Sequence, residues 1–319
     1  MREIKRYIIE KLKISKQTYT LFPKTKSGLK RMITTEIKKH GNECSLNHID
    51  VSKITDMSGI FEESEFNGDI SNWDVSNVTN MQAMFYKSDF NGDISDWNVS
   101  NVENMAHMFT TSKFNRDISG WDVSNVENMQ GMFTYSKFNG DISKWDVSNV
   151  ENMQSMFYGA AFNGDISKWD VSNVTNMSAM FQRSAFNKDI ANWDISNLND
   201  MAGMFTYSKF TGDISNWDVS KVTNMSDMFS WSEFNGDISG WDVSNIWNMS
   251  YMFNGSKFTG ENGDISGWNV SNVKDMQCMF YKSEFNRDIS KWDVSNVKNM
   301  DGMFDDSPLE KNPPKWYKA

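Results

Sequence analysis

The sequence predicts an α/β solenoid of about ten to eleven stacked coils, each 24 residues long, with a parallel β-sheet on one face, short helices on the other and a helical N-terminal cap. Three observations predict this fold class. Tryptophans recur at a fixed step, the apolar residues change their period within each repeat, and almost every large apolar residue belongs to the repeat. Of the 23 methionines twenty occupy two fixed repeat positions, and of the 22 phenylalanines twenty-one do so.

The tryptophan step defines a repeat array over residues 48–304. An earlier copy without tryptophan begins at Ile49. The step is 24 residues, except that Trp241 and Trp268 are 27 apart because Glu261-Asn262-Gly263 is inserted between them. We expect this insertion to lie in a surface loop. The ten full copies begin at Trp73, Trp97, Trp121, Trp145, Trp169, Trp193, Trp217, Trp241, Trp268 and Trp292.

A short strand is expected around each tryptophan. The first full copy has the spacing I-x-x-W-x-V-x-x-V, set by Ile70, Trp73, Val75 and Val78. This is the spacing of the L-x-x-L-x-L-x-x-N/C motif, so the stack is predicted to be leucine-rich-repeat-like. Trp73 and Val75 are two residues apart and would point to one side of a strand, while Asp74 would point to the other.

A short helix is expected after the strand. Val78, Met81, Met84 and Phe85 fall at i, i+3, i+6 and i+7, which is one helical stripe, and Ser76 stands at the N-cap position. The helix must be short, because an Asn-Gly-Asp turn follows within a few residues. Such a coil cannot bury its apolar face alone, so neighbouring coils are predicted to stack.

Residues 1–47 are predicted to form a basic helical segment and cap. Leu29, Met32 and Ile33 belong to an amphipathic stripe that continues to Ile37 and is closed by Gly41, which suits the open side of the first coil. A second helical stripe precedes it and would either pack on the cap or serve as a docking tag; it contains Ile4, Tyr7, Ile8 and Leu12.

Residues 305–319 abandon the repeat motif and are predicted to form the C-terminal cap. This segment contains Leu309, Trp316 and Tyr317 together with two adjacent prolines, Pro313 and Pro314. An apolar cluster of this kind would cover the last coil.

The charge of the chain is divided unevenly. Residues 1–47 hold 12 Lys and Arg against 4 Asp and Glu, a net charge of +8, and the remainder holds 20 against 38, a net charge of −18. The acidic array argues against nucleic-acid binding along its length. No segment approaches the length of a membrane span. Glu10 and Lys11 interrupt the N-terminal apolar run, so no secretory signal peptide is expected.

Nothing in the sequence indicates catalysis. The three histidines, His40, His48 and His107, do not recur with the repeat, and no nucleophile–base pair is apparent. Cys44 and Cys278 are far apart and lack the spacing of a zinc site or a disulfide framework. We therefore expect a protein that is not an enzyme and needs no cofactor.

Two ladders of aspartates run through the repeats, and like charges at the spacing of stacked strands repel one another. Calcium binding would compensate this repulsion, with Asp69, Asp93, Asp117 and Asp141 as the candidate ligands. The alternative is that the carboxylates accept hydrogen bonds in turns. Asn98 and Asn269 replace aspartate in the other ladder, which favours hydrogen bonding there. That ladder lies on the face that would bind a basic partner or cations, and comprises Asp74, Asp122, Asp146, Asp170, Asp194, Asp218, Asp242 and Asp293.

Aromatic residues gather just after the Met-Phe pair of several copies. Since the core positions are already filled, these rings are expected to be at least partly exposed along one edge, where they would form a recognition surface. Packing of the rings between coils is the alternative. The candidate ligand-binding residues are Tyr86, Tyr135, Tyr158, Tyr207, Trp231 and Tyr281, with Tyr251 one helical turn earlier.

The repeat W-D-V-S-N-V-x-N-M-x-x-M-F, followed by F-N-G-D-I-S, resembles that of the BspA-like group of bacterial surface proteins, a relative of the leucine-rich repeats. The resemblance covers about residues 48–304. It implies a non-enzymatic binding or adhesion role, commonly at the cell surface, with a protein or glycan as ligand. The location and oligomeric state stay open, as a monomer or an assembly component. Two alternatives are an intracellular or virion-associated structural component docked through its N-terminal helix, and a calcium-binding rod.

Overall fold

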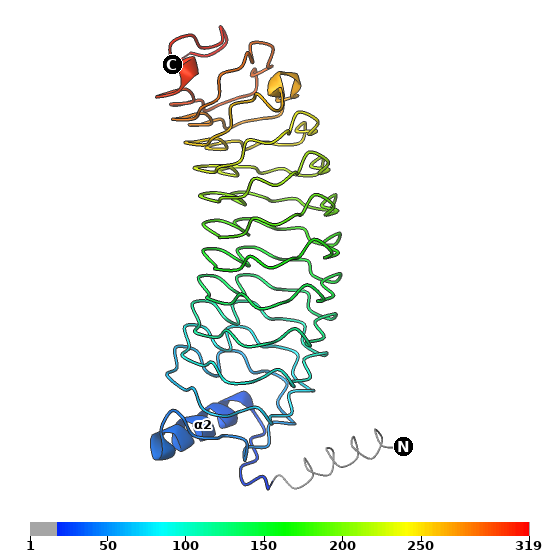
Figure 1. Ribbon diagram of the computed structural model, residues 1–319, viewed down its shortest axis with the longest axis vertical. Helices are drawn as coiled ribbons and strands as arrows, with labels where there is room; N and C mark the ends of the chain where they lie inside the picture. Colours follow the sequence, from blue (N-terminus) through cyan, green and yellow to red (C-terminus); the bar gives the residue numbers. More distant parts are fainter. Residues whose placement is uncertain (1–17, 319) are drawn as a thin grey trace.

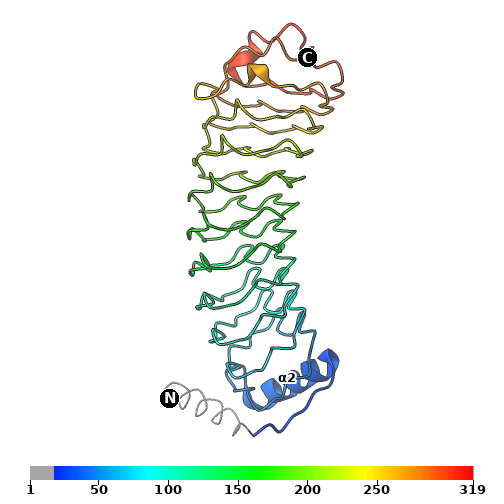
Figure 2. The ribbon, with the colours of Figure 1, turned by 90° about the vertical axis from the view of Figure 1, so that its right-hand side faces the viewer.

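The computed structural model describes residues 18–318. Figure 1 shows them as a tall column of coils that lie one upon another, with the two ends of the described chain at opposite ends of the column. The same column appears after a quarter turn in Figure 2, so the coils are stacked along one axis and do not form separate globules. The chain is a repeat protein in which each 24-residue copy makes one coil.

The secondary structure of the column differs from the prediction. Residues 18–318 contain one α-helix, α2 (Lys26–His40), and two 3-10 helices, η1 (Ile265–Gly267) and η2 (Pro308–Glu310). Neighbouring coils are joined by isolated parallel β-bridges, each one residue wide, that run from Asp56 to Asn299. The predicted α/β solenoid is therefore wrong: the described part of the chain has neither a leucine-rich-repeat-like parallel sheet nor a row of short helices.

Turns within each coil explain why no sheet forms around the tryptophan. The backbone N–H of Trp73 donates to the carbonyl of Ile70 at 3.1 Å. The carboxylate of Asp74 accepts the backbone N–H of Ser76 at 3.1 Å and its hydroxyl at 2.6 Å. Ser76 is thus part of an aspartate turn and not the N-cap of a helix. Because these donors are used inside the coil, they cannot build a ladder to the next coil.

Alternating hydrogen bonds explain why no helix follows. The N–H of Met84 donates to the carbonyl of Met81 within the coil at 3.1 Å, whereas the N–H of Phe85 donates to the carbonyl of Met108 in the next coil at 3.0 Å. Ala83, which lies between Met81 and Met84, has a φ of 53°, in the left-handed region that interrupts a right-handed helix. Consecutive turns therefore place the apolar stripe in the core without a helix.

Columns of like side chains form the core. The rings of Phe85 and Phe109, in neighbouring coils, are 5.6 Å apart and nearly parallel, and those of Trp73 and Trp97 are 6.4 Å apart. The indole N–H of Trp97 donates to the carbonyl of Ile70 at 3.2 Å, and equivalent bonds recur along the column. The repeat tryptophans are at most 4% exposed. Each interior coil is thus covered by the coils on both sides of it.

The helix α2 covers the N-terminal end of the column (Figure 1). It begins after Thr25, whose hydroxyl accepts a backbone N–H of the first turn, and it ends at Gly41, which has a φ of 85°. Leu29 and Ile33 are buried in the same core as the coils. The second helical stripe predicted ahead of it falls on residues 1–17, which lie outside the described residues.

The C-terminal end continues the 24-residue step in a different sequence. Trp316 lies 24 residues after Trp292, and the two indoles are 6.5 Å apart. The indole N–H of Trp316 donates to the carbonyl of Ile289 at 3.1 Å, the bond that every repeat tryptophan makes with the preceding coil. Leu309, in η2, is 9% exposed. This segment therefore supplies part of one more coil.

Candidate functional site

Two residues in the turns of most coils adopt the left-handed backbone conformation, four positions apart. In one coil these are Asp227 and Trp231, with φ values of 57° and 54°. Asp227 is equivalent to Tyr251 of the next coil, and Trp231 to Tyr207 of the preceding one. Equivalent positions of stacked coils lie above one another, so these side chains follow one edge of the column. We call this surface the aromatic edge. Its aromatic residues at the two left-handed positions are Tyr135, Tyr207, Trp231 and Tyr251, and those one residue before the second position are Tyr86, Tyr158 and Tyr281.

Three rings of the aromatic edge are the most exposed. Tyr135 is 50% exposed, Tyr207 49% and Trp231 44%, whereas the core tryptophans are almost fully buried. The ring of Tyr135 meets that of Tyr158 edge to face at 4.9 Å. The remaining four rings are half-buried: Tyr86, Tyr158, Tyr251 and Tyr281. The edge thus combines packing between coils with accessible aromatic surface.

Contacts along the edge hold the exposed rings in place. The guanidinium of Arg183 lies 4.9 Å from the centre of the Tyr207 ring, and that ring is parallel to the indole of Trp231 at 6.1 Å. Trp231 in turn lies against Gly255, where an added Cβ would come within 2.6 Å of the indole. Ordered aromatic residues of this kind offer contact area at low entropic cost.

Lysines of the chain itself pair with an aromatic ring and a carboxylate at two places near this edge. The ammonium of Lys87 lies 5.1 Å from the centre of the Tyr86 ring and 3.0 Å from the carboxylate of Glu63. The same arrangement recurs with Lys282, which lies 4.9 Å from the Tyr281 ring and 3.9 Å from the Asp306 carboxylate. The fold therefore brings together acid, ring and cation repeatedly.

A groove of about 510 Å³ opens beside the exposed rings. Tyr207, Trp231 and Tyr251 line it together with Asp227 and Asn254. Burial raises the pKa of the Asp227 carboxyl. The side-chain oxygen of Asn254 is buried and has no hydrogen-bond partner among residues 18–318. The groove thus combines a half-buried carboxylate with an aromatic surround, and the unpaired oxygen of Asn254 is buried.

The sequence prediction included the three rings of this groove but missed Asp227 and Asn254. A signal was present for Asp227: it is the one acidic residue at its repeat position, where the other coils have Gly, Ala, Ser, His, Tyr or Cys. Asn254 had no comparable signal, because its repeat position is polar or aromatic in every coil.

The aspartates of the ladder that begins at Asp74 lie on a different part of the coil and form turns. Each carboxylate accepts the backbone N–H of the serine two residues later, at 3.0 to 3.1 Å. Asn98 accepts the equivalent N–H at 3.2 Å. All of the predicted members are exposed: Asp74, Asp122, Asp146, Asp170, Asp194, Asp218, Asp242 and Asp293. Their geometry is that of a structural turn, with free carboxylate oxygen facing solvent.

The ladder that begins at Asp69 has the same local geometry. The carboxylates of Asp69, Asp93, Asp117 and Asp141 accept serine N–H groups at 2.9 to 3.0 Å. The backbone N–H groups of the serines hold the pKa of Asp93, Asp117 and Asp141 below its usual value. Within residues 18–318, no group of three or more His, Cys, Asp or Glu side chains is arranged to hold a metal ion.

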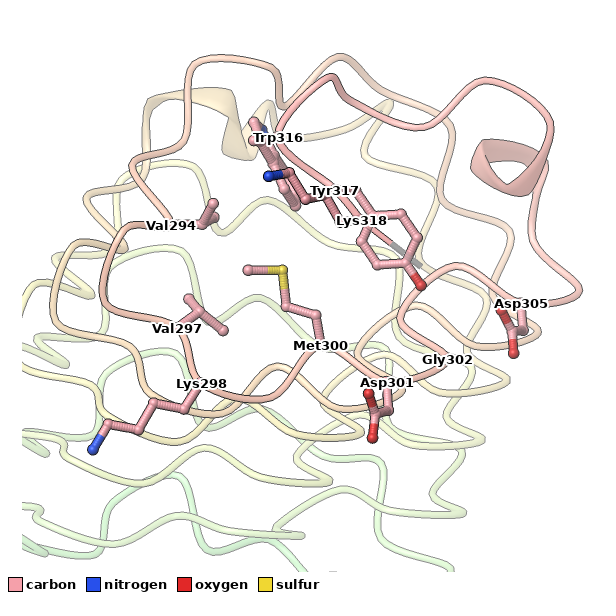
Figure 3. A pocket seen from close by; sticks show the side chains of 10 residues that line it. All are labelled: Val294, Val297, Lys298, Met300, Asp301, Gly302, Asp305, Trp316, Tyr317 and Lys318. Atoms are coloured by element: carbon pink, nitrogen blue, oxygen red, sulfur yellow. The ribbon is translucent and has the colours of Figure 1, made fainter.

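A second groove, of about 570 Å³, lies at the C-terminal end of the column. Figure 3 shows Val294, Val297 and Met300 facing it, with Trp316 and Tyr317 on its other side. Val294, Val297 and Met300 are half-buried, although the equivalent residues of interior coils are almost completely buried. The groove exists because Trp316 and Tyr317 cover only part of the last coil.

Two of the three histidines lie beside the same carboxylate. His40 and His48 both lie near the carboxylate of Glu36, at 3.7 and 3.3 Å. Cys44 and Cys278 are free thiols. In residues 18–318, no helix is long and apolar enough to cross a bilayer.

One family model matches the chain. Its description is "Mycoplasma protein of unknown function, DUF285", and it matches residues 28–137, 110–211, 132–232 and 206–316, which together span most of the sequence. No curated protein and no solved structure matches the chain.

Proposed function

This chain belongs to the family of Mycoplasma proteins of unknown function, DUF285, and we propose that it is a non-enzymatic repeat scaffold that binds a protein or glycan ligand along its aromatic edge. The observation that carries the proposal is the exposure of Tyr135, Tyr207 and Trp231, each 44 to 50% exposed, on a column that buries its core tryptophans and phenylalanines. A row of exposed rings along one edge can mark an interaction site, and Tyr and Trp are enriched among the residues that dominate binding energy.

The column suits a scaffold role because it is long and internally braced. Every interior coil bonds to both neighbours through the backbone, the indole N–H groups and the aromatic columns. A ligand at the edge would meet rings that are already ordered, so binding would require little further loss of conformational entropy.

The biological context that we propose is adhesion or surface recognition. The repeat motif resembles that of BspA-like surface proteins, and the exposed rings lie on an extended column with room for a large partner. The net charge of −18 over residues 48–319 favours a basic partner over an acidic one.

The test is a binding screen with matched variants. The purified protein is applied to a glycan array and to an array of extracellular proteins, beside a triple variant, Tyr135→Ala, Tyr207→Ala and Trp231→Ala. The control is Trp247→Ala, which removes a tryptophan that is 49% exposed outside the aromatic edge. We expect at least one ligand whose signal falls about tenfold or more in the triple variant and is unchanged in the control. Signals that survive in the triple variant would rule the edge out.

A further inference from the structure

Asp227 is the acidic residue that lines the groove, and its carboxylate is half-buried without a partner among residues 18–318. Among residues 18–318 no lysine or arginine forms an ion pair with it, and no donor forms a hydrogen bond with its side chain. Burial in the groove raises its pKa, because desolvation disfavours the charged form and nothing compensates. A cation beside the carboxylate would offset this desolvation.

The side-chain oxygen of Asn254 is the second acceptor of the groove. It is buried without a partner among residues 18–318, and leaving a buried acceptor unpaired is unfavourable. The unpaired side-chain groups at the groove are therefore acceptors, so the carboxylate of Asp227 calls for a ligand that brings donors. An ammonium or guanidinium group carries three or five N–H donors and no acceptor.

The aromatic residues around the acceptors favour a positive charge. Tyr207, Trp231 and Tyr251 line the groove, and aromatic faces attract cations, tryptophan most strongly. The chain makes such contacts itself: Lys87 lies near both the Tyr86 ring and Glu63, and Lys282 lies near both the Tyr281 ring and Asp306. The groove at Asp227 has the acid and the rings of that arrangement. Arg183 contacts the Tyr207 ring, but among residues 18–318 no lysine or arginine pairs with Asp227.

We propose that the groove formed by Tyr207, Asp227, Trp231, Tyr251 and Asn254 binds the side chain of a lysine or arginine from a basic segment of a protein partner, with Asp227 as its counter-ion. This inference rests on the proposed function, since the groove is part of the aromatic edge. A protein segment is favoured as the source because the acidic column, at −18, would attract the other basic residues of such a segment.

The test uses three fluorescent probes: an acetylated and amidated peptide of alternating Gly and Lys, eight residues long, its Gly-Gln counterpart, and a neutral glucose hexamer. Anisotropy titrations are run with the wild-type protein, Asp227→Asn and Trp231→Ala. The control is Asp242→Asn, which removes the same charge from an exposed aspartate already bonded to Ser244. We expect the lysine peptide to bind the wild-type protein about tenfold or more tightly than it binds Asp227→Asn and Trp231→Ala, with Asp242→Asn within about twofold of wild type.

Other outcomes overturn the inference and are distinguishable from failure of the proposed function. Equal losses in Asp227→Asn and Asp242→Asn would mean non-specific attraction to an acidic surface. Binding of the glucose hexamer but not of the lysine peptide, lost in Trp231→Ala, would keep the aromatic edge as a binding surface and remove the cationic ligand. Absence of binding to all probes would reject the lysine site, while the array experiment with the triple aromatic variant would still decide the broader proposal. Thermal unfolding of Asp227→Asn serves as the folding control, and we expect its midpoint to equal or exceed that of wild type, because an unpaired half-buried charge is removed.

Discussion

At the N-terminal end of the column, α2 places Leu29 and Ile33 in the core and leaves the first coil fully covered. At the C-terminal end, Trp316 and Tyr317 leave Val294, Val297 and Met300 half-buried beside the groove of Figure 3. The first end is closed by a separate element with its own apolar stripe, whereas the second is closed by a fragment of one more coil. The difference shows that burial in this fold is supplied by the neighbour and not by the coil itself.

Loss of an interior tryptophan should have the largest effect, because both of its neighbours lose contacts. Trp169→Ala removes a buried indole and its 3.1 Å hydrogen bond to the carbonyl of Ile142. We expect a loss of about 3–5 kcal/mol in the free energy of unfolding, measured by urea denaturation. The control Trp247→Ala, at an exposed indole, should change it by less than about 0.5 kcal/mol. Similar losses in both variants would refute the account of the core.

The N-terminal end should be the more sensitive of the two ends. Leu29→Ala leaves a cavity between α2 and the first coil, and we expect a loss of about 3 kcal/mol. Hydrogen exchange would locate the damage, with faster exchange in the first coils and unchanged protection in the coils after Trp241. Uniform acceleration along the column would show that the coils unfold as one unit and that the ends cannot be compared separately.

The C-terminal end should respond less. Trp316→Ala removes a half-buried indole and its bond to the carbonyl of Ile289, so we expect a loss of about 2 kcal/mol, with faster exchange confined to the last coils. Trp316→Phe, which keeps a ring but loses the donor, would separate packing from hydrogen bonding. A loss equal to that of Leu29→Ala would mean that the two ends are closed equally well.

The aspartate ladder that begins at Asp69 runs from one end of the column to the other, so acid should weaken both ends alike. Serine N–H groups lower the pKa of Asp93, Asp117 and Asp141 in the folded state below the ordinary 3.8. Their stabilising contribution is therefore present above that pH and is lost as the pH falls through the folded-state values. We expect the midpoint temperature of thermal unfolding to decrease once the pH is below about 4, and hydrogen exchange to become faster at both ends of the column. A stability that is constant down to pH 2 would contradict this.

Substitutions within the ladder that begins at Asp74 should have the smallest effect. Asp122→Asn keeps the acceptor for Ser124, as Asn98 does for Ser100, and removes one like charge, so we expect a change within about 0.5 kcal/mol. Asp122→Ala should cost about 1 kcal/mol, because the turn loses its acceptor. We also expect calcium to leave the thermal midpoint unchanged; a rise on adding calcium, reversed by a chelator, would identify the ladders as cation sites.

The sequence prediction identified the members of the core well. The tryptophan, valine, methionine and phenylalanine positions of the interior repeats are buried, and Leu29 and Ile33 lie in the cap. These predictions succeeded because burial follows from which positions are apolar at every step of the repeat. The 24-residue distance from Trp292 to Trp316 was also available in the sequence, but the change of motif around it obscured its place in the tryptophan column.

The backbone conformation was predicted wrongly for a physical reason. The apolar spacing of Val78, Met81, Met84 and Phe85 fits one face of a helix, yet it fits a series of turns equally well when alternate N–H groups can reach the carbonyls of another coil. That reach joins Phe85 to Met108, 23 residues away, and no local pattern contains it. The sequence by itself determined the length of the repeat, the residues of the core and the acidic character of the column. Only the tertiary structure decided that coils meet at single bridges without forming a sheet, and that Asp227 and Asn254 share a groove, because both depend on which groups of one coil face those of the next.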